Sequence, residues 1–319
     1  MAISIILIIL GFILLIKGAD LLVDGSSEIA KRFHIPEIII GLTIVSIGTS
    51  MPELFVSSAS ASNGSPDMAI GNIIGSNLCN LLLILGLSAL IKPVRFQRET
   101  RLIEMPMSLI ITIIFMIFCN TDGTITKTEG IILIVLFIAF LIYTIVMGIK
   151  GEQFDKDEES PEIKNNKKQP LIIKNIIFIV AGIIALKFGG DLTIDHATKI
   201  AKMFNVSEKV IGLTILAIGT SLPELVTSVT AAIKGNSDIA IGNIIGSNIF
   251  NILLIIGVSS LISPLAYNFT YNIQMWILIA ALLVLALFPI IPPKNEMSRI
   301  NGAIYLVMYV LYMGFLFVK

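Results

Sequence analysis

Long apolar stretches separated by short polar segments cover almost the whole chain. Most reach the roughly 17–25 residues that a tilted helix needs to cross a hydrocarbon core about 30 Å thick. The pattern predicts ten membrane-spanning helices, at about 3–23, 38–62, 67–91, 102–119 and 129–149, then 175–194, 208–233, 238–262, 273–291 and 301–318. The expected fold class is an all-α membrane protein.

One long polar segment interrupts this pattern. Residues 150–174 are acidic at first and basic afterwards, and they include two prolines. A solvated linker is the favoured interpretation, with a regulatory ion-binding segment as the alternative. The expected organisation is a first five-helix unit at 1–149, a polar linker at 150–174 and a second five-helix unit at 175–319.

The two five-helix units are copies of one another. At a shift of 171 positions, the window 41–88 matches 212–259 without a gap at about 30 of 48 positions. Because five is odd, the second copy must enter the membrane from the opposite side. Inverted-topology repeats of this kind are typical of secondary transporters, whose substrate sites lie near the midplane on interrupted helices.

The basic residues predict which end of the bundle faces the cytoplasm. With the linker placed inside, the basic residues that also fall inside are Lys31, Arg32, Lys92, Arg95, Arg98, Arg101, Lys234, Lys294 and Arg299. Only scattered lysines such as Lys127, Lys209 and Lys319 remain outside. We therefore expect a multi-pass protein of the cell membrane with a cytoplasmic linker and both termini outside.

Composition agrees with a membrane protein and excludes several functions. Hydrophobic residues make up 55% of the chain and charged residues 14%, and the mean hydropathy is +0.94. A soluble globule of this length needs more polar surface than that. The net charge is zero, so no basic field indicates nucleic-acid binding. No phosphate-binding loop, dinucleotide fingerprint or nucleophile elbow occurs, so an enzyme or an ATP-driven pump is disfavoured.

Two copies of one motif place a carboxylate inside an apolar span. They are Gly48-Thr49-Ser50-Met51-Pro52-Glu53 and Gly219-Thr220-Ser221-Leu222-Pro223-Glu224. In the first copy, the hydroxyls of Thr49 and Ser50 share a helix face with Glu53. Pro52 has no N–H to donate to Gly48, so the helix is expected to break there and leave carbonyl oxygens free. The second copy repeats this arrangement.

Carboxylates, hydroxyls and free carbonyls are hard oxygen ligands, which suit Na⁺ or Ca²⁺ and do not suit zinc or copper. The alternative is that Glu53 merely pairs with a Lys or Arg of another span. That alternative is weak because no basic residue lies deep in the core spans. Carboxylates isolated in a membrane mark ion pathways.

A second motif also occurs twice, directly after the first. Its copies are Gly71-Asn72-Ile73-Ile74-Gly75-Ser76-Asn77-Leu78-Cys79-Asn80 and Gly242-Asn243-Ile244-Ile245-Gly246-Ser247-Asn248-Ile249-Phe250-Asn251. Its glycine spacing permits close helix packing. Ser76 and Asn80 lie one turn apart and present two neutral oxygen ligands, as do Ser247 and Asn251. Polar contacts between helices are the alternative, and we assign the remaining asparagines of the motif to such contacts and to capping.

Together, the paired motifs resemble the α-repeats of the cation/Ca²⁺ exchanger superfamily, in its Na⁺/Ca²⁺ exchanger branch. The resemblance implies an antiporter that exchanges Na⁺ for Ca²⁺ by alternating access, without a cofactor. It also implies that the first spans of the two repeats slide against the rest. The cation ligands it implies are Glu53, Glu224, Thr49, Ser50, Thr220, Ser221, Ser76 and Ser247, with the backbone carbonyls of Ser46 and Ala217.

One departure from the family affects charge. Some members carry an aspartate at one of the positions that are Asn80 and Asn251 here. This site therefore holds two acidic side chains, whose charge one Ca²⁺ or two Na⁺ would balance. A Ca²⁺/H⁺ exchanger, a K⁺-dependent Na⁺/Ca²⁺ exchanger and a passive cation channel remain the alternatives. The expected partners are the two cations and the lipid bilayer, and no protein partner follows from the sequence.

Overall fold

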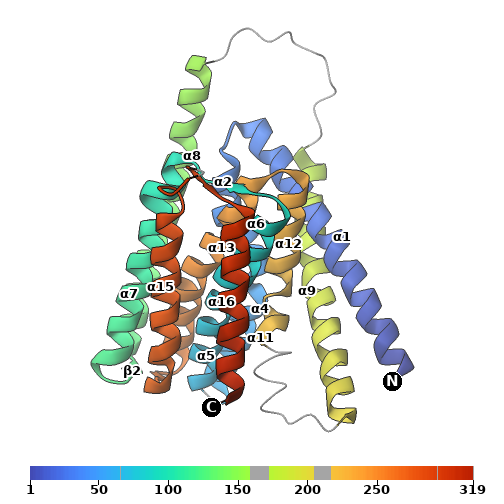
Figure 1. The fold of residues 1–319 in the computed structure, drawn as a ribbon, viewed down its shortest axis with the longest axis vertical. Helices are drawn as coiled ribbons and strands as arrows, with labels where there is room; N and C mark the ends of the chain where they lie inside the picture. Colours follow the sequence, from blue (N-terminus) through green and yellow to red (C-terminus); the bar gives the residue numbers. More distant parts are fainter. Residues whose placement is uncertain (65, 159–171, 205–216, 293, 319) are drawn as a thin grey trace.

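The computed structural model describes residues 1–64, 66–158, 172–204, 217–292 and 294–318. The chain forms a bundle of long helices (Figure 1). Both termini lie at one end of the bundle, whereas α8 ends and α9 begins at the other end. This arrangement agrees with a chain that crosses a membrane an even number of times.

The elements of the first half are α1 (Ala2–Phe33), α2 (Glu37–Ile40), η1 (Gly41–Val45), α3 (Ser46–Thr49), α4 (Met51–Ser62), α5 (Pro66–Leu78), η2 (Cys79–Ile84), α6 (Leu85–Ile91), β1 (Val94–Arg95), η3 (Thr100–Glu104), α7 (Met105–Thr121), β2 (Thr124–Ile125) and α8 (Lys127–Glu158). Those of the second half are α9 (Ile172–Met203), α11 (Ala217–Thr220), α12 (Leu222–Lys234), α13 (Ser237–Phe250), η5 (Asn251–Ile256), α14 (Gly257–Ile262), β3 (Leu265–Ala266), η6 (Phe269–Tyr271), α15 (Asn272–Leu287), β4 (Glu296–Met297) and α16 (Arg299–Val318). Segments η1, η2, η3 and η5 are π-helical.

Within the described residues, eight helices are long and apolar enough to cross a membrane. The bent pair Glu37–Thr49 and Met51–Ser62, whose halves are inclined by 47°, is also long and apolar enough when it is counted as one broken span. The all-helical membrane class is therefore confirmed. The expected span at 208–233 lies partly outside the described residues, so ten spans remain a prediction.

Several helices are longer than hydrophobicity alone predicts. Helices α1 and α9 each have 32 residues, or about 48 Å at 1.5 Å per residue, which exceeds the thickness of a hydrocarbon core. Their polar last turns fall outside the apolar windows at 3–23 and 175–194. Helix α8 continues to Glu158, into the segment expected to be a linker. Hydropathy does not reveal polar helix ends, because a polar segment in water has the same low hydropathy whether it is helical or a loop.

Two short antiparallel strand pairs connect the halves. Strand β1 pairs with β4 through Val94 opposite Met297, and β2 pairs with β3 through Thr124 opposite Ala266. These connections were not predicted, because two-residue strands leave no hydrophobic period to detect. Each pair joins a loop of the first half to a loop of the second.

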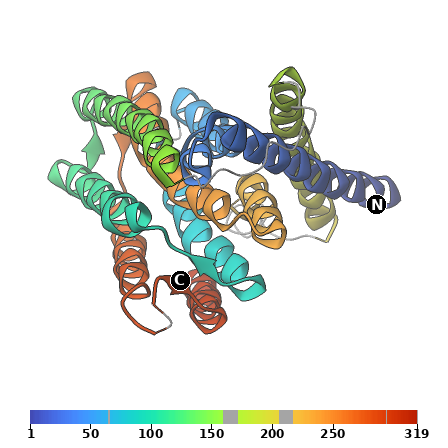
Figure 2. The same ribbon diagram turned by 90° about the horizontal axis from the view of Figure 1, so that it is seen from above.

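Helix α13 lies at the centre of the bundle, and neighbouring helices surround it (Figure 2). Every residue from Ile239 to Phe250 is buried. A Cβ added to Gly242 would lie 2.7 Å from the carbonyl oxygen of Ile38, and one on Gly246 would lie 2.9 Å from Leu42 Cα. The motif glycines therefore bring α13 into backbone contact with the α2–η1–α3 segment, as small residues do in membrane helices.

Helices α1 and α9 pack against each other in antiparallel directions along a seam of glycines. A Cβ on Gly11 would lie 2.9 Å from the carbonyl oxygen of Gly189, and one on Gly18 would lie 2.9 Å from that of Gly182. The glycines are seven residues apart on both helices, which is two turns, so they remain on one face. The first helices of the two halves thus form a closely packed pair at the side of the bundle (Figure 1).

Candidate cation-binding site

Both glutamate motifs lie where a helix is interrupted. In the first half, α3 ends at Thr49 and α4 begins at Met51, and Ser50 between them has φ −84° and ψ 8°. Ser221 separates α11 from α12 with nearly the same angles, φ −87° and ψ 6°. Each helix is therefore broken at a serine two residues before the motif proline, Pro52 or Pro223. The missing proline N–H predicts a break in this region.

Replacing Pro52 with Ala should restore a backbone donor and allow α3 and α4 to join into one straighter helix. Glu53 lies in the first turn of α4, directly after the 47° bend, so a straighter helix would move its carboxylate. We therefore expect the Michaelis constant for the transported cation to rise severalfold while the protein still folds. Ion affinity measured by flux titration checks this. Pro106→Ala in the first turn of α7, outside the site, is the control. An unchanged affinity in Pro52→Ala would mean that packing alone maintains the bend.

Each glutamate accepts a hydrogen bond from a serine of the other repeat. Ser50 Oγ donates to Glu224 Oε1 at 2.9 Å, and Ser221 Oγ donates to Glu53 Oε1 at 3.4 Å. Ser76 Oγ lies 3.5 Å from the same Glu53 oxygen. The carboxylates are 1% and 0% exposed, and within the described residues their Oε2 atoms have no hydrogen-bond partner. The two glutamates therefore belong to one buried site that both repeats build.

The second motif contains a change in helix type at its last asparagine in both halves. Asn80 lies at the start of the π-helical segment η2, and Asn251 is the first residue of η5. Such segments insert an extra residue into a helical turn and occur often at functional sites. Among the described residues, Asn80 Oδ1, Asn251 Oδ1 and Ser247 Oγ are buried without a hydrogen-bond partner. Buried oxygens of this kind are unfavourable unless something else binds them.

The remaining predicted ligands are less uniform. Thr49 Oγ1 donates to Asn243 Oδ1 at 3.0 Å, whereas Thr220 Oγ1 is buried and unpartnered among the described residues. The Ser46 carbonyl accepts from the Ser50 N–H at 3.0 Å. Thr49 Oγ1 lies 3.4 Å from the same carbonyl oxygen as a second donor. Ala217 is the first residue of α11.

Two serines that the sequence analysis did not single out support the site. Asn243 Nδ2 donates to Ser228 Oγ at 2.9 Å, and Asn72 Nδ2 donates to Ser57 Oγ at 3.1 Å. Both serines lie one turn after the motif glutamates, at the same position in each repeat. That equivalence is the signal by which they could have been found. Asn72 and Asn243 thus connect the two motifs, as their assignment to interhelical contacts predicts.

Neither glutamate forms a salt bridge with a basic side chain of the described residues. Lys187 lies within the apolar part of α9, yet it pairs with Asp191 one turn later at 2.7 Å, and its side chain is 42% exposed. The described residues also contain no group of three or more His, Cys, Asp or Glu side chains suited to a metal ion. The side chains that hydrogen-bond to the two carboxylates are instead serine hydroxyls.

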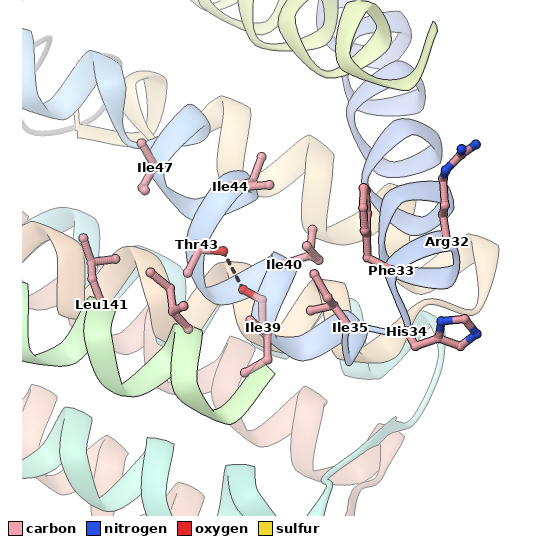
Figure 3. A pocket seen from close by; sticks show the side chains of 11 residues that line it. Arg32, Phe33, His34, Ile35, Ile39, Ile40, Thr43, Ile44, Ile47 and Leu141 are labelled. Carbon is pink, nitrogen blue, oxygen red and sulfur yellow. Dashed lines mark hydrogen bonds between the residues drawn. The ribbon is translucent and has the colours of Figure 1, made fainter. Parts of the chain in front are cut away.

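A separate cavity of about 560 Å³ lies near the end of α1, between α2, η1 and α8. Its wall is mainly isoleucine, and Figure 3 shows Thr43 using its hydroxyl within its own helix, toward the Ile39 carbonyl. None of the predicted cation ligands lines it. An apolar cavity of this kind cannot replace the hydration shell of a cation, so the site of interest is the carboxylate cluster.

Comparison with known proteins agrees with this geometry. The sequence profile of the family described as "Sodium/calcium exchanger protein" matches residues 3–146 and 174–318. This chain belongs to the sodium/calcium exchanger family. The two matched segments are the two repeats, so each half of the family pattern contributes one broken helix and one glutamate to the site.

Relatives within the sodium/calcium exchanger family match over nearly their whole length. The "Putative antiporter CaxA" of Alkalimonas amylolytica is 36% identical, with 99% of each chain covered. The "Sodium/calcium exchanger MaX1" of Methanosarcina acetivorans is 32% identical with the same coverage. A solved structure of the sodium-calcium exchanger NCX_Mj superposes with a TM-score of 0.84 at 34% identity and covers 98% of this chain and 99% of that one.

Proposed function

We propose that this protein is a secondary active antiporter that exchanges Na⁺ for Ca²⁺ across the cell membrane. The observation that carries the proposal is the pair of buried glutamates from two repeats, each with one oxygen that no described residue satisfies. Two carboxylates in a desolvated site require compensating positive charge. One Ca²⁺ or two Na⁺ would supply that charge, so the two ions can compete for one site.

The proposed ligands are the oxygens gathered around this pair. They are the side chains of Glu53, Glu224, Thr49, Ser50, Thr220, Ser221, Ser76, Ser247, Asn80 and Asn251, with the carbonyls of Ser46 and Ala217. Ca²⁺ takes six to eight oxygen ligands, which part of this set of hard donors would supply. The serine hydroxyls that now donate to the carboxylates would turn their lone pairs toward a bound cation.

Alternating access would be achieved by movement of α1 and α9 as one unit. The glycine seam joins these helices closely, and α1 contacts α12 of the site through side chains. Lys234 of α12 lies 3.0 Å from Asp20 and 2.8 Å from Asp24 of α1. The equivalent position in the first repeat is Asn63, which carries no charge. The ion pairs of Lys234 therefore have no charged equivalent at Asn63, and they stabilise the observed position of α1 against α12.

Lys234→Gln should shift the conformational population away from the observed position of α1. A partly exposed ion pair contributes little, so we expect at most about a fivefold change in maximal exchange rate. Distances between spin labels at Ile9 and Val310 would report the shift. Lys187→Gln, which removes an ion pair within α9 alone, should leave the distances unchanged. Identical distance distributions in Lys234→Gln and wild type would contradict this role.

We also propose that the end of the bundle where α8 stops and α9 starts faces the cytoplasm, with both termini outside. The basic residues near that end favour this orientation under the positive-inside rule. Accessibility of single cysteines in cells to an impermeant reagent tests it. If the reagent added outside labels a cysteine that replaces Asn301 and does not label one that replaces Asp122, the orientation is the opposite of the proposed one.

Ca²⁺ flux into proteoliposomes tests the function directly. Vesicles loaded with Na⁺ should take up ⁴⁵Ca²⁺ when diluted into Na⁺-free buffer, and vesicles without a Na⁺ gradient should not. Uptake driven by a proton gradient would indicate a Ca²⁺/H⁺ exchanger, and a requirement for K⁺ would indicate a K⁺-dependent exchanger. Uptake that needs no counter-ion would indicate a passive channel and would overturn the proposal.

A further inference from the structure

Four asparagines of the second motif form a crossed pair of hydrogen bonds between the repeats. Asn251 Nδ2 donates to Asn77 Oδ1 at 2.9 Å. The equivalent bond in the other direction runs from Asn80 Nδ2 to Asn248 Oδ1 at 3.1 Å. Each of the two proposed amide ligands is thus bound by an asparagine of the opposite repeat.

The orientation of these amides follows from what their partners can do. Asn77 Nδ2 donates to the backbone carbonyl of Asn248 at 3.3 Å, and Asn248 Nδ2 donates to that of Asn77 at 3.4 Å. A carbonyl oxygen only accepts, so the amino group of each amide must face it. The Oδ1 atom of Asn77 must then face Asn251, and the Oδ1 atom of Asn248 must face Asn80.

This constraint decides which atom each ligand asparagine presents to the site. Because Asn251 gives its amino group to Asn77, its Oδ1 atom points elsewhere, and the same holds for Asn80 and Asn248. Both Oδ1 atoms are buried and have no hydrogen-bond partner among the described residues. Asn80 is 1% and Asn251 is 0% exposed, so water does not satisfy these oxygens at the surface.

We propose that Asn77 and Asn248 are positioning residues that fix the amides of Asn251 and Asn80 with oxygen, not nitrogen, toward the transported cation. The inference rests on the proposed function. An amide turned by half a rotation would direct two N–H groups at the cation and repel it. Each repeat therefore sets the ligand orientation in the other, which links the two halves of the site.

Asn77→Leu removes the oxygen that accepts the hydrogen bond from Asn251 Nδ2, while keeping a side chain of similar size. The Asn251 amide can then rotate, and we expect the Michaelis constant for Ca²⁺ to rise about tenfold, the upper range for one hydrogen bond. Asn248→Leu should do the same through Asn80. Ca²⁺-dependent flux in Na⁺-loaded proteoliposomes gives this constant for each variant.

The decisive measurement is a crossed rescue. The side chain of Asn251→Asp has an oxygen on both sides and no N–H to donate to Asn77 Oδ1, so its orientation no longer depends on that hydrogen bond. Adding Asn77→Leu to Asn251→Asp should therefore change the Michaelis constant less than twofold, whereas adding it to Asn80→Asp should keep the full tenfold loss. Asn248→Leu should show the opposite pattern, with rescue by Asn80→Asp alone. Such coupling between specific pairs is what a double-mutant cycle measures.

A purely structural role of Asn77 and Asn248 predicts that ion affinity falls equally in every background, without rescue by an aspartate. Loss of the bond to the backbone carbonyl lowers thermal stability equally in every background, so melting temperatures should fall in parallel whether or not ion affinity is rescued. An equal loss of affinity in all backgrounds, or no loss in Asn77→Leu, overturns the inference. If a leucine variant fails to fold, Asn77→Ala and Asn248→Ala must show the same crossed pattern. Absence of exchange in the wild type instead overturns the proposed function.

Discussion

Replacing Glu53 with Gln is expected to abolish Na⁺-driven Ca²⁺ uptake, and Glu224→Gln is expected to do the same. Glutamine preserves the size of the side chain but removes one of two negative charges from a site that water does not reach. A divalent ion in such surroundings needs both charges. We expect the initial rate of ⁴⁵Ca²⁺ uptake into Na⁺-loaded proteoliposomes to fall about 100-fold or more, or ~2.7 kcal/mol.

A matched control exists elsewhere in the membrane domain. Glu104 in η3 is also a buried carboxylate, 1% exposed, and its Oε2 atom has no hydrogen-bond partner among the described residues. It has no equivalent glutamate in the second repeat, where Met275 occupies the position. Glu104→Gln should therefore keep most of the exchange activity. Uptake by Glu53→Gln at the wild-type rate would show that this carboxylate does not bind the ion.

Gly18→Leu is expected to separate α1 from α9 and to remove both stability and exchange. A Cβ at this position would lie 2.9 Å from the Gly182 carbonyl oxygen and 2.9 Å from the Leu186 nitrogen. Both are backbone atoms, which cannot rotate away as a side-chain end does. Overpacking costs typically about 1–3 kcal/mol, and here the whole seam must widen. We expect a lower melting temperature in detergent and at least about a tenfold loss of flux.

Gly314→Leu in α16 provides the comparison, because no heavy atom of the described residues lies within 4 Å of a Cβ added there. It introduces the same side chain into another membrane helix and should leave the melting temperature and flux close to wild type. If Gly18→Leu behaved like Gly314→Leu, the two helices would not be held together by their glycines, and their movement as one unit would lose its structural basis.

The membrane class, the duplication and the central carboxylates are determined by sequence because their causes are local. A proline without an N–H breaks its own helix wherever that helix lies, and the breaks at Ser50 and Ser221 are where the motifs predict them. A carboxylate in an apolar span is unfavourable in any fold, and Glu53 and Glu224 are distinguished from Glu104 by their occurrence in both copies of one motif, so they could be identified before their surroundings were known. The site ligands themselves remain a proposal.

Partners between helices depend on the tertiary structure. The sequence contains Gly11, Gly18, Gly182 and Gly189, but only the fold places them opposite one another. The same is true of Lys234, whose pairing with Asp20 and Asp24 crosses more than two hundred residues. Such contacts are decided by the direction and register with which distant helices meet, and a local pattern does not contain that information.

The asparagines show this division within one motif. Their spacing indicates which residues share a helix face, and it singled out Asn80 and Asn251 as oxygen ligands. It assigned Asn77 and Asn248 only to contacts between helices. Which amide faces which carbonyl follows from the tertiary contact that brings Asn77 and Asn248 beside each other. The residue types follow from the sequence alone, whereas the direction in which each amide turns is decided by the tertiary structure, because a hydrogen bond orients an amide only when its partner is in place.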